Sequence, residues 1–392
     1  MGVNLEVLPK LSLRPNTTFM KNIYVAATGQ HVGKTTSTLG LVAALQARGY
    51  STGYCKPVGQ QNLTIDGKTA DKDAVLFAKV IGFDIVPEWH SPVVLAQGAT
   101  KKFLENPDDF NFRHRILEAA AYLEASRDIM VYEGTGHPGV GSVVNLSNAE
   151  VAKMLNAGIV MVVEGGIGRT IDRLHMSMAL FREKNLPVLG VLVNKVIPEK
   201  REEVEYFLNK KLTEMNMPLL GVLPYDRSLS YPIMETINQA IDGKVVANGH
   251  RLSNRVEDII AGSLVDVDEF SMFRNILLVV SQKRLNEAIE KINAVAKLKK
   301  LQRTPLSGVI VTGDGRHENW FKMDTVQHPY CIEHEIPVIT TILDTYGSVV
   351  KISRIEVKIN TRTPWKIKRA IALIKEHVNF DLLLDRMKQF NG

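Results

Sequence analysis

The sequence has few of the residues that would indicate a secreted or membrane-bound protein. It contains two cysteines, Cys55 and Cys331, which lie far apart and offer neither a disulfide framework nor a cysteine-rich metal site. No segment is apolar over the roughly 20 residues needed to span a bilayer, and residues 1–21 lack the apolar core of a signal peptide. We therefore expect a cytoplasmic protein without a membrane partner.

Aromatic residues are also scarce, at 7% of the chain, and this affects how its net charge of +6 is interpreted. Residues 244–392 carry 23 basic and 17 acidic side chains, whereas residues 1–243 carry 25 of each. The basic excess is not accompanied by the aromatic side chains on which nucleic-acid bases stack. We interpret it as solvated helix faces and do not expect a nucleic-acid partner.

What the sequence does contain is an apolar strand at residues 22–27, a glycine-containing loop and a helix at residues 37–48. This order is typical of a phosphate-binding loop, in which backbone N–H groups and a helix N-terminus face an anion. The strict pattern begins with glycine at position 28, where this chain has Thr28, and Gly29 follows one place later. Lys34 would reach the β- and γ-phosphates of ATP, and the Thr35 hydroxyl would ligate Mg²⁺. The expected nucleotide-binding residues are Gly29, Gln30, His31, Val32, Gly33, Lys34, Thr35 and Thr36.

Apolar strands and helices alternate through the rest of the first 240 residues. Strands are expected at 51–59, 128–133, 159–163, 188–194 and 219–223, and helices at 71–81, 115–126, 171–184 and 200–215. Near-continuous apolar strands separated by helices favour a parallel sheet covered on both faces. The expected fold is α/β, with a parallel, doubly wound P-loop NTPase sheet and a second, smaller α/β domain. Ligands bind such sheets at the carboxyl ends of the strands, where Lys34, Lys56, Glu133 and Asn194 fall.

Several charged side chains near these strand ends could complete a nucleotide site. Glu133 suits a Mg²⁺ ligand, because Mg²⁺ takes few protein carboxylates beside water and phosphate oxygens; it could also be a surface or helix-capping residue. Asp71 and Asp73 could add to the metal shell or merely complement a helix dipole. Lys56 could neutralise a transferred phosphoryl group or an anionic substrate, or be an exposed lysine at a strand end.

Composition shifts near residue 243, which suggests four parts. We expect an N-terminal extension at 1–21, the P-loop domain at 22–243, a second domain at 244–360 and C-terminal helices at 361–392. Within the second domain we expect a helix at 256–261, strands at 276–280 and 308–312, and an apolar segment at 336–342. Residues 83–107 are expected to form an irregular excursion beside the substrate.

Several of these segments occur in the same order as in dethiobiotin synthetase, which the region 22–240 resembles. The matching segments are residues 28–35, 53–58, 73–74, 133–136, 193–194 and 218–224. The resemblance implies ATP and Mg²⁺ as cofactors, a small-molecule substrate, and a homodimer, since that enzyme completes its substrate site across a dimer interface. It further implies that Thr35, Asp73 and Glu133 hold Mg²⁺, that Lys34 and Lys56 act on phosphates and substrate as catalytic residues, and that Asn194 reads the adenine.

The second domain resembles the DRTGG domain, which follows the same P-loop domain in the N-terminal part of long phosphotransacetylases. The matching stretches are residues 308–315 and 344–346, whereas residues 281–284 differ from the family's usual Gly-Asp-Arg turn. The acyltransferase domain of those enzymes is missing, so we do not expect a phosphate acetyltransferase. Cobyrinic acid a,c-diamide synthases share the P-loop fold but need a glutaminase domain with a nucleophilic cysteine. Neither cysteine here has that context, so we do not expect a glutamine amidotransferase.

The resemblance to dethiobiotin synthetase stops on the substrate side. This chain has Gln30 and His31 where that family has threonine and an acidic residue, Gly59 and Gln60 where it has a small residue and serine, and His137 where it has glycine. Two functions remain open. The protein could be an ATP-dependent, ligase-like enzyme or ATPase that phosphorylates a carboxylate or carbamate of a small metabolite. Alternatively, it could be an ATP-binding regulatory protein whose DRTGG-like domain senses a ligand, with little turnover.

Overall fold

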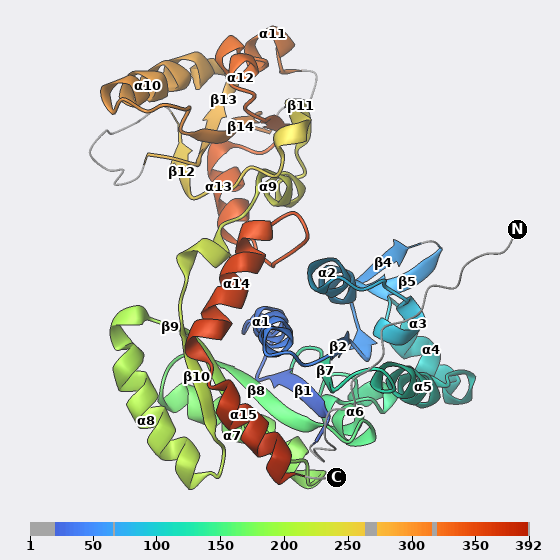
Figure 1. The fold of residues 1–392 in the computed structure, drawn as a ribbon. Coiled ribbons are helices and arrows are strands. Elements are labelled where there is room, and N and C mark those ends of the chain that lie inside the picture. Colours follow the sequence, from blue (N-terminus) through green and yellow to red (C-terminus); the bar gives the residue numbers. More distant parts are fainter. Residues whose placement is uncertain (1–19, 66, 263–272, 316–319, 391–392) are drawn as a thin grey trace, which may run out of the picture. The chain divides into compact units, whose positions relative to one another are not determined.

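The computed structural model describes residues 20–65, 67–262, 273–315 and 320–390, and the chain forms two compact units (Figure 1). Unit 1 comprises Met1–Pro224 and Leu373–Gly392, and unit 2 comprises Tyr225–Ala372. The predicted N-terminal extension at 1–21 falls almost entirely on residues 1–19, which lie outside the described residues. Within the described part, no helix is both long and apolar enough to cross a membrane.

Unit 1 is built on a six-stranded sheet with the order β10-β9-β8-β1-β7-β2. Its strands are β1 (Asn22–Ala27), β2 (Thr52–Cys55), β7 (Ile129–Glu133), β8 (Gly158–Glu164), β9 (Val188–Val196) and β10 (Leu219–Pro224). All neighbouring pairs are parallel. The prediction of a parallel α/β sheet is therefore confirmed. Because β1 pairs with β7 and β7 with β2, the carboxyl ends of these three strands lie side by side.

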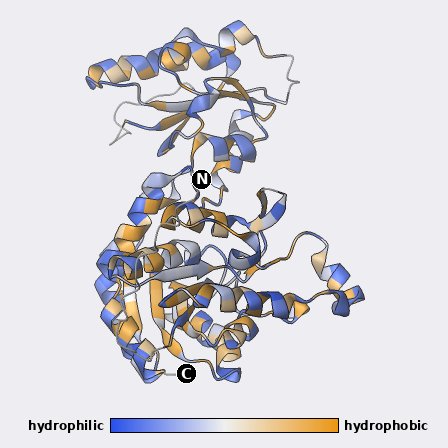
Figure 2. Ribbon diagram, turned by 45° about the vertical axis from the view of Figure 1, so that its right-hand side comes forward, coloured by the Kyte–Doolittle hydropathy of each residue, from blue (hydrophilic) through white to orange (hydrophobic). Residues whose placement is uncertain are grey.

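Helices cover both faces of this sheet. They are α1 (Lys34–Ala47), α2 (Lys72–Ile81), α5 (Phe112–Glu124), α6 (Asn148–Met154), α7 (Gly168–Glu183), α8 (Arg201–Glu214) and α15 (Phe380–Gln389). Tyr24, Met161 and Val193 from the strands share one buried cluster with residues of α5, α6, α7 and α8. Strand residues of the opposite parity, such as Val25 and Val160, are equally buried, and on that face α1 and α15 pack against the strands (Figure 1). Figure 2 shows the resulting pattern, with apolar strands between helices of mixed hydropathy.

The segment between β2 and α5 has more regular structure than predicted. A short parallel pair forms between β3 (Val58–Gly59) and β6 (Val93–Val94), and an antiparallel hairpin between β4 (Asn62–Ile65) and β5 (Lys68–Asp71). The region 83–107, expected to be irregular, contains α3 (Pro87–His90) and α4 (Ala99–Glu105). Its regularity follows from burial, since Pro87, Val93 and Phe103 are buried.

The chain returns to unit 1 at its end, which the predicted boundaries at 243 and 361 did not foresee. Phe380, Leu383 and Met387 of α15 are buried, and the Met20 N–H donates to the Met387 carbonyl at 3.0 Å. The helix α14 (Pro364–His377) contains the unit boundary between residues 372 and 373. Burial of α15 therefore assigns the last twenty residues to the first compact unit.

Unit 2 has a five-stranded sheet of its own, with the order β11-β15-β14-β13-β12. Its strands are β11 (Lys244–Ala247), β12 (Asp258–Ala261), β13 (Ile276–Ser281), β14 (Leu306–Thr312) and β15 (Val338–Thr341). Only β11 runs antiparallel to its neighbour. Its helices other than α14 are α9 (Met234–Ala240), α10 (Leu285–Leu298), α11 (Met323–Val326), α12 (Pro329–Glu333) and α13 (Thr345–Ser353). Short 3₁₀ turns complete both units at Pro107–Asp109, Ser142–Val144, Pro198–Lys200, Arg227–Ser230, Gly249–Arg251 and Gln282–Arg284.

Both faces of the second sheet are buried, by different helices. Leu278 and Val280 of β13 share a cluster with α10, whereas Leu277 and Val279 share one with α9 and α13. Because α9 buries its apolar side here, residues 225–243 belong to unit 2. The helix predicted at 256–261 is wrong: residues 258–261 form β12, whose partner β13 supplies the backbone hydrogen bonds.

Candidate functional site

The loop between β1 and α1 depends on Gly33. This residue has a φ of 100°, in the left-handed region that side chains rarely adopt. A Cβ at Gly33 would lie 2.0 Å from the Asn194 Nδ2, so glycine is required for a second reason. The helix α1 begins at Lys34, and its N-terminal amides and positive dipole end face the loop, an arrangement that suits phosphate groups. Residues 29–36 thus follow the carboxyl end of β1 in the predicted order of strand, loop and helix.

Glu133 ends β7 beside this loop and is completely buried. One of its carboxylate oxygens accepts a hydrogen bond from the Thr35 hydroxyl at 2.8 Å, and the other accepts one from the Tyr54 hydroxyl at 3.1 Å. Tyr54 lies on β2 and stacks on Phe77 of α2, with ring centroids 3.6 Å apart. Glu133 is therefore neither a surface residue nor a helix cap, and side chains of α1 and β2 contact its carboxylate.

Lys56, which follows β2, is enclosed by carboxylates. Its amine forms an ion pair with Asp73, lies 3.4 Å from an Asp71 oxygen and lies 3.9 Å from a Glu133 oxygen. Only 8% of its side chain is exposed to solvent. Lys56 is therefore not the exposed strand-end lysine of the alternative interpretation.

Asp71 and Asp73 have different surroundings, although they lie two residues apart. The Asp71 carboxylate accepts hydrogen bonds from the backbone N–H groups of Gln60 and Gln61, both at 3.1 Å, and from that of Asp73 at 2.9 Å. It therefore caps α2 and fixes the turn after Lys56. Asp73 is more exposed, at 24% of its side chain, and pairs with Lys56. Asp71 thus has a structural role, and Asp73 keeps an accessible carboxylate.

Burial and mutual charge shift the protonation of this cluster. Burial raises the pKa of Glu133 to about 7, although Lys56 opposes the rise. Burial, together with the charge of Lys56, lowers the pKa of Lys34 to about 8, against the opposing effect of Glu133. For Lys56, burial alone would lower the pKa, but Asp73, Glu133 and Asp71 outweigh it and raise the pKa above its ordinary value. Lys56 therefore stays charged at neutral pH, whereas Glu133 is poised between its two states.

The loop after β7 is held by a buried asparagine, Asn148, at the start of α6. Its side-chain amide donates to the carbonyls of Thr135 and His137, at 2.8 and 2.7 Å. Its oxygen accepts from the Tyr24 hydroxyl at 2.8 Å and from the Thr135 N–H at 2.9 Å. In the loop that Asn148 fixes, the Gly136 carbonyl accepts a hydrogen bond from the Lys34 amine at 3.3 Å. Asn148 therefore links the core of the sheet to the loop that contacts Lys34.

Two neighbouring residues of β9 contact the phosphate loop from the other side. The side-chain amide of Asn194 donates to the Val32 carbonyl at 2.8 Å, and the Lys195 amine donates to the His31 carbonyl at 2.6 Å. Lys195 also lies 3.1 Å from a carboxylate oxygen of Glu164, at the end of β8. The predicted role of Asn194 toward adenine stays a prediction, since this contact joins it to the loop.

The donor set fits a Mg²⁺ ion with few protein ligands. Thr35 and Glu133 lie within hydrogen-bonding distance of each other, and Asp73 contacts Lys56, which also faces Glu133. In the described residues, no group of three or more histidine, cysteine, aspartate or glutamate side chains could hold a metal alone. Mg²⁺ usually retains several waters and takes phosphate oxygens beside one or two carboxylates. One hydroxyl and one or two carboxylates therefore suit it, provided that phosphates supply the remaining ligands.

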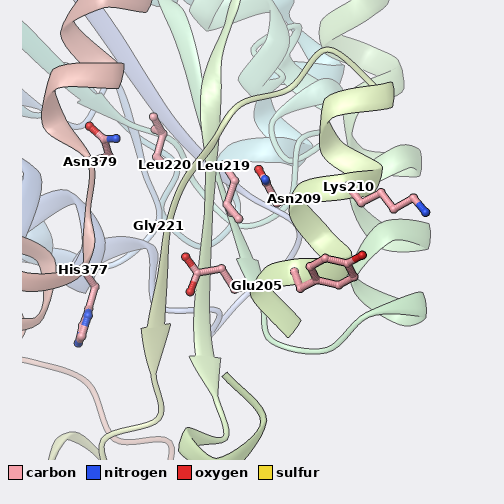
Figure 3. A pocket seen from close by; sticks show the side chains of 9 residues that line it. Glu205, Asn209, Lys210, Leu219, Leu220, Gly221, His377 and Asn379 are labelled. Atoms are coloured by element: carbon pink, nitrogen blue, oxygen red, sulfur yellow. The ribbon is translucent and has the colours of Figure 1, made fainter. Parts of the chain in front are cut away.

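A cavity of about 440 Å³ lies elsewhere in unit 1, along the edge strand β10. Figure 3 shows Glu205, Asn209 and Lys210 of α8 on one side and His377 and Asn379 on the other. The backbone approaches closely here, because a Cβ at Gly221 would lie 2.2 Å from the His377 carbonyl oxygen. None of the predicted nucleotide, metal or catalytic residues lines this cavity.

The sequence identified five side chains that the structure brings together and missed others that position them. The five are Lys34, Thr35, Lys56, Asp73 and Glu133, which meet beyond the carboxyl ends of β1, β2 and β7. Missed were Tyr54, Asn148 and Lys195. Of these, Tyr54 lies in the matching segment 53–58 and Lys195 follows the predicted site residue Asn194, whereas Asn148 carried no sequence signal.

Comparison with known proteins gives relatives for both units. The phosphate acetyltransferase of Nitrosomonas europaea is 24% identical over 380 residues, covering 94% of this chain and 52% of that protein. The phosphate acetyltransferase of Pseudomonas aeruginosa is 24% identical over 387 residues, with the same coverage. This chain thus spans about half the length of these curated relatives. The ATP-dependent dethiobiotin synthetase of Clostridium kluyveri is 27% identical over 230 residues, covering 55% of this chain and 91% of that protein.

Among solved structures, the MinD cell division protein of Aquifex aeolicus is 14% identical to this chain. The match covers 54% of this chain and 84% of the MinD chain. Its TM-score of 0.35 is too low to support an argument.

These matches overturn one expectation. From the sequence we do not expect a phosphate acetyltransferase, because it lacks the acyltransferase domain of the long phosphotransacetylases. Proteins of that name nevertheless match 94% of the chain, and the shared part includes the phosphate loop and the second unit. A family model described as an AAA domain matches residues 21–232, which is more than half of the chain. The chain therefore belongs to this AAA domain family, and its P-loop unit is similar to dethiobiotin synthetase.

Proposed function

We propose that unit 1 binds ATP with Mg²⁺ and transfers the γ-phosphoryl group to a carboxylate or carbamate of a small metabolite. The observation that carries this proposal is the convergence of Lys34, Thr35, Lys56, Asp73 and Glu133 beside the N-terminus of α1. Phosphoryl transfer needs mainly positioning and neutralisation of charge, and this cluster supplies two cations and a hydroxyl–carboxylate pair. The dethiobiotin synthetase of Clostridium kluyveri, whose name states that it is ATP-dependent, supports ATP as the nucleotide.

In this proposal Thr35, Glu133 and Asp73 hold Mg²⁺, which would neutralise charge on the phosphate oxygens. Lys34 binds the β- and γ-phosphates, and Asn194 accepts a hydrogen bond from the adenine amino group through its side-chain oxygen. Lys56 orients the acceptor carboxylate. One oxygen of that carboxylate attacks the γ-phosphorus, the bond to the bridging oxygen breaks, and ADP leaves with its electron pair. The product is an acyl or carbamoyl phosphate.

The test follows the fate of a carboxylate oxygen. Purified protein is incubated with ATP, Mg²⁺ and a panel of small carboxylic acids, or amines with bicarbonate, labelled with ¹⁸O at the carboxylate. If an acyl or carbamoyl phosphate forms and its acyl–oxygen bond later breaks, inorganic phosphate carries one ¹⁸O, which mass spectrometry detects. Lys56→Met is the matched variant, because it preserves the apolar stem and removes the charge. Phosphate release without ¹⁸O from any acceptor would contradict the transfer step and leave a simple ATPase.

A second candidate function is regulation, and a different observation favours it. The matches to phosphate acetyltransferases extend across both units, so the P-loop unit and the second unit occur together in proteins of that name. In this alternative, ATP at unit 1 and a ligand at the DRTGG-like unit 2 control phosphate acetyl transfer, with little ATP turnover. ATP binding without phosphate release, together with an ATP-dependent change in acetyl phosphate formation from acetyl-CoA and phosphate, would favour this function over the first.

We further propose that the protein is a homodimer in the cytoplasm, as the resemblance to dethiobiotin synthetase implies. Light scattering coupled to size-exclusion chromatography tests the oligomeric state directly. A monomer at micromolar concentrations, with and without Mg²⁺-ATP, would contradict it.

A further inference from the structure

The phosphate loop is held from one side by two consecutive residues of β9. Asn194 donates its side-chain amide to the Val32 carbonyl at 2.8 Å, and Lys195 donates its amine to the His31 carbonyl at 2.6 Å. The two acceptors are consecutive as well, so neighbouring donors on a rigid strand meet neighbouring carbonyls of the loop. β9 pairs with β8 as far as Asn194 and with β10 at Val193 and Val196, so Lys195 lies at an irregularity that strand pairing holds on both sides.

The direction of these carbonyls determines where the loop amides point. A peptide unit is planar and trans, so the carbonyl of one residue and the N–H of the next point in opposite directions. The His31 carbonyl faces Lys195, and hence the Val32 N–H points away from Lys195. The Val32 carbonyl faces Asn194, and hence the Gly33 N–H points away from Asn194. Successive backbone N–H groups turned to one side form a concave site for anions.

The backbone on both sides of this contact is in a conformation that side chains seldom adopt. His31 has a φ of 58° and Lys195 a φ of 59°, and Gly33 of the same loop has a φ of 100°. Non-glycine residues in the left-handed region persist where the surrounding structure holds them, and they concentrate at functional sites. The hydrogen bond between the Lys195 amine and the His31 carbonyl directly joins two such residues.

We propose that Lys195 is a positioning residue of the phosphate loop, which orients the Val32 and Gly33 amides toward a polyphosphate before it binds. Lys195 acts through the His31 carbonyl and does not itself contact the phosphates. Glu164 neutralises its charge at 3.1 Å, so the attraction of Lys195 for a distant anion is largely cancelled. This inference rests on the proposed binding of ATP at unit 1 and adds the residue that prepares the loop.

The test compares variants of the full chain for binding of Mg²⁺-ATP and of inorganic tripolyphosphate, by isothermal titration. Lys195→Met keeps the length of the stem and loses the donor, and we expect about tenfold weaker binding of both ligands, as for loss of a hydrogen bond from a charged donor. The double variant Lys195→Met with Glu164→Gln removes one charge of each sign and leaves the net charge of the pair unchanged. We expect the same tenfold loss in it. Glu164→Gln alone keeps the bond to His31 and should change binding by less than about twofold.

Different results identify different failures. Unchanged affinity in Lys195→Met would overturn the inference and leave ATP binding intact, whereas a wild-type protein that binds neither ligand would instead remove the proposed function. A loss confined to ATP would mean that Lys195 contacts the nucleoside. Recovery of affinity in the double variant would mean that Lys195 acts only by neutralising Glu164, and it would overturn the inference. Labelling of the buried Cys55 thiol reports whether unit 1 stays folded, and a loss of affinity with unchanged Cys55 protection is the result that supports the inference.

Discussion

The burial of Glu133 predicts that the stability of unit 1 changes with pH. It also predicts that a single substitution abolishes this pH dependence. Its carboxylate is inaccessible to solvent and faces Thr35, Tyr54 and Lys56. Glu133→Gln preserves the shape of the side chain and cannot ionise. The variant therefore isolates the contribution of the carboxylate charge.

The size and sign of the effect follow from the pKa of Glu133, which burial raises from 4.5 to about 7. Below pH 4.5 the group is protonated in both the folded and unfolded chain, and the stabilisation is fully present. As the pH rises toward 7, the unfolded chain loses the proton while the folded chain retains it, so the free energy of unfolding falls. At about 1.4 kcal/mol per pH unit, the fall amounts to about 3 kcal/mol and is complete above pH 7. Glu133→Gln lacks this fall.

The two cysteines provide the assay, because one is buried in each unit. Cys55 lies in unit 1 and Cys331 in unit 2. Labelling of each thiol by a pyridyl disulfide, read by peptide mass spectrometry, reports the opening of its own unit. The ratio of wild-type to variant labelling at Cys55 cancels the pH dependence of the thiol itself. We expect this ratio to rise about 100-fold between pH 5 and pH 8, while the ratio at Cys331 stays constant. A Cys55 ratio that does not change with pH would refute the reasoning.

Three further predictions concern the same site. Lys34→Ala should weaken ATP binding by about 2–5 kcal/mol, because it removes a charge partner of the phosphates; near-native affinity by isothermal titration would sink the phosphate-loop assignment. Asn148→Ala should destabilise unit 1 by about 3 kcal/mol or more, since it leaves several buried polar groups unpaired; equal Cys55 labelling in wild type and Asn148→Ala would contradict this. With ATP, Mg²⁺, bicarbonate and 7,8-diaminopelargonic acid, the protein should not form dethiobiotin at an enzyme-like rate, because Gln30, His31 and Gln60 differ from that family in size and hydrogen-bonding groups; mass spectrometry that detects robust product would reverse it.

The sequence predicted the first sheet and the central residues of the site for a simple physical reason. In a parallel sheet, residues that follow different strands meet at one edge, so the position of Lys56 after β2 and of Glu133 at the end of β7 implies proximity to the loop after β1. Nothing more than strand order is needed. Both side chains do lie in one cluster with Asp73.

The prediction was weaker where local pattern and tertiary contacts disagree. Residues 256–261 combine two acidic with four apolar residues, and six residues are too few to distinguish a strand from a helix by periodicity. Pairing with β13 makes it a strand. Likewise, the amphipathic segment that forms α15 gave no sign of which unit it would cover, because any apolar surface could accept Phe380 and Leu383.

The positioning residues were the hardest to predict, because their roles depend on contacts between distant parts of the chain. Asn148 contacts Tyr24, which is 124 positions away, and Lys195 contacts His31, which is 164 positions away. Neither residue type is unusual in its segment. Lysine in particular is mostly a surface residue, and 35% of the Lys195 side chain is indeed exposed. Its role follows from three facts that only coordinates supply: the acceptor is a carbonyl of the phosphate loop, both backbones are left-handed, and a carboxylate neutralises the charge. Sequence patterns therefore predict which groups cluster in a candidate site, whereas the groups that orient them require the structure.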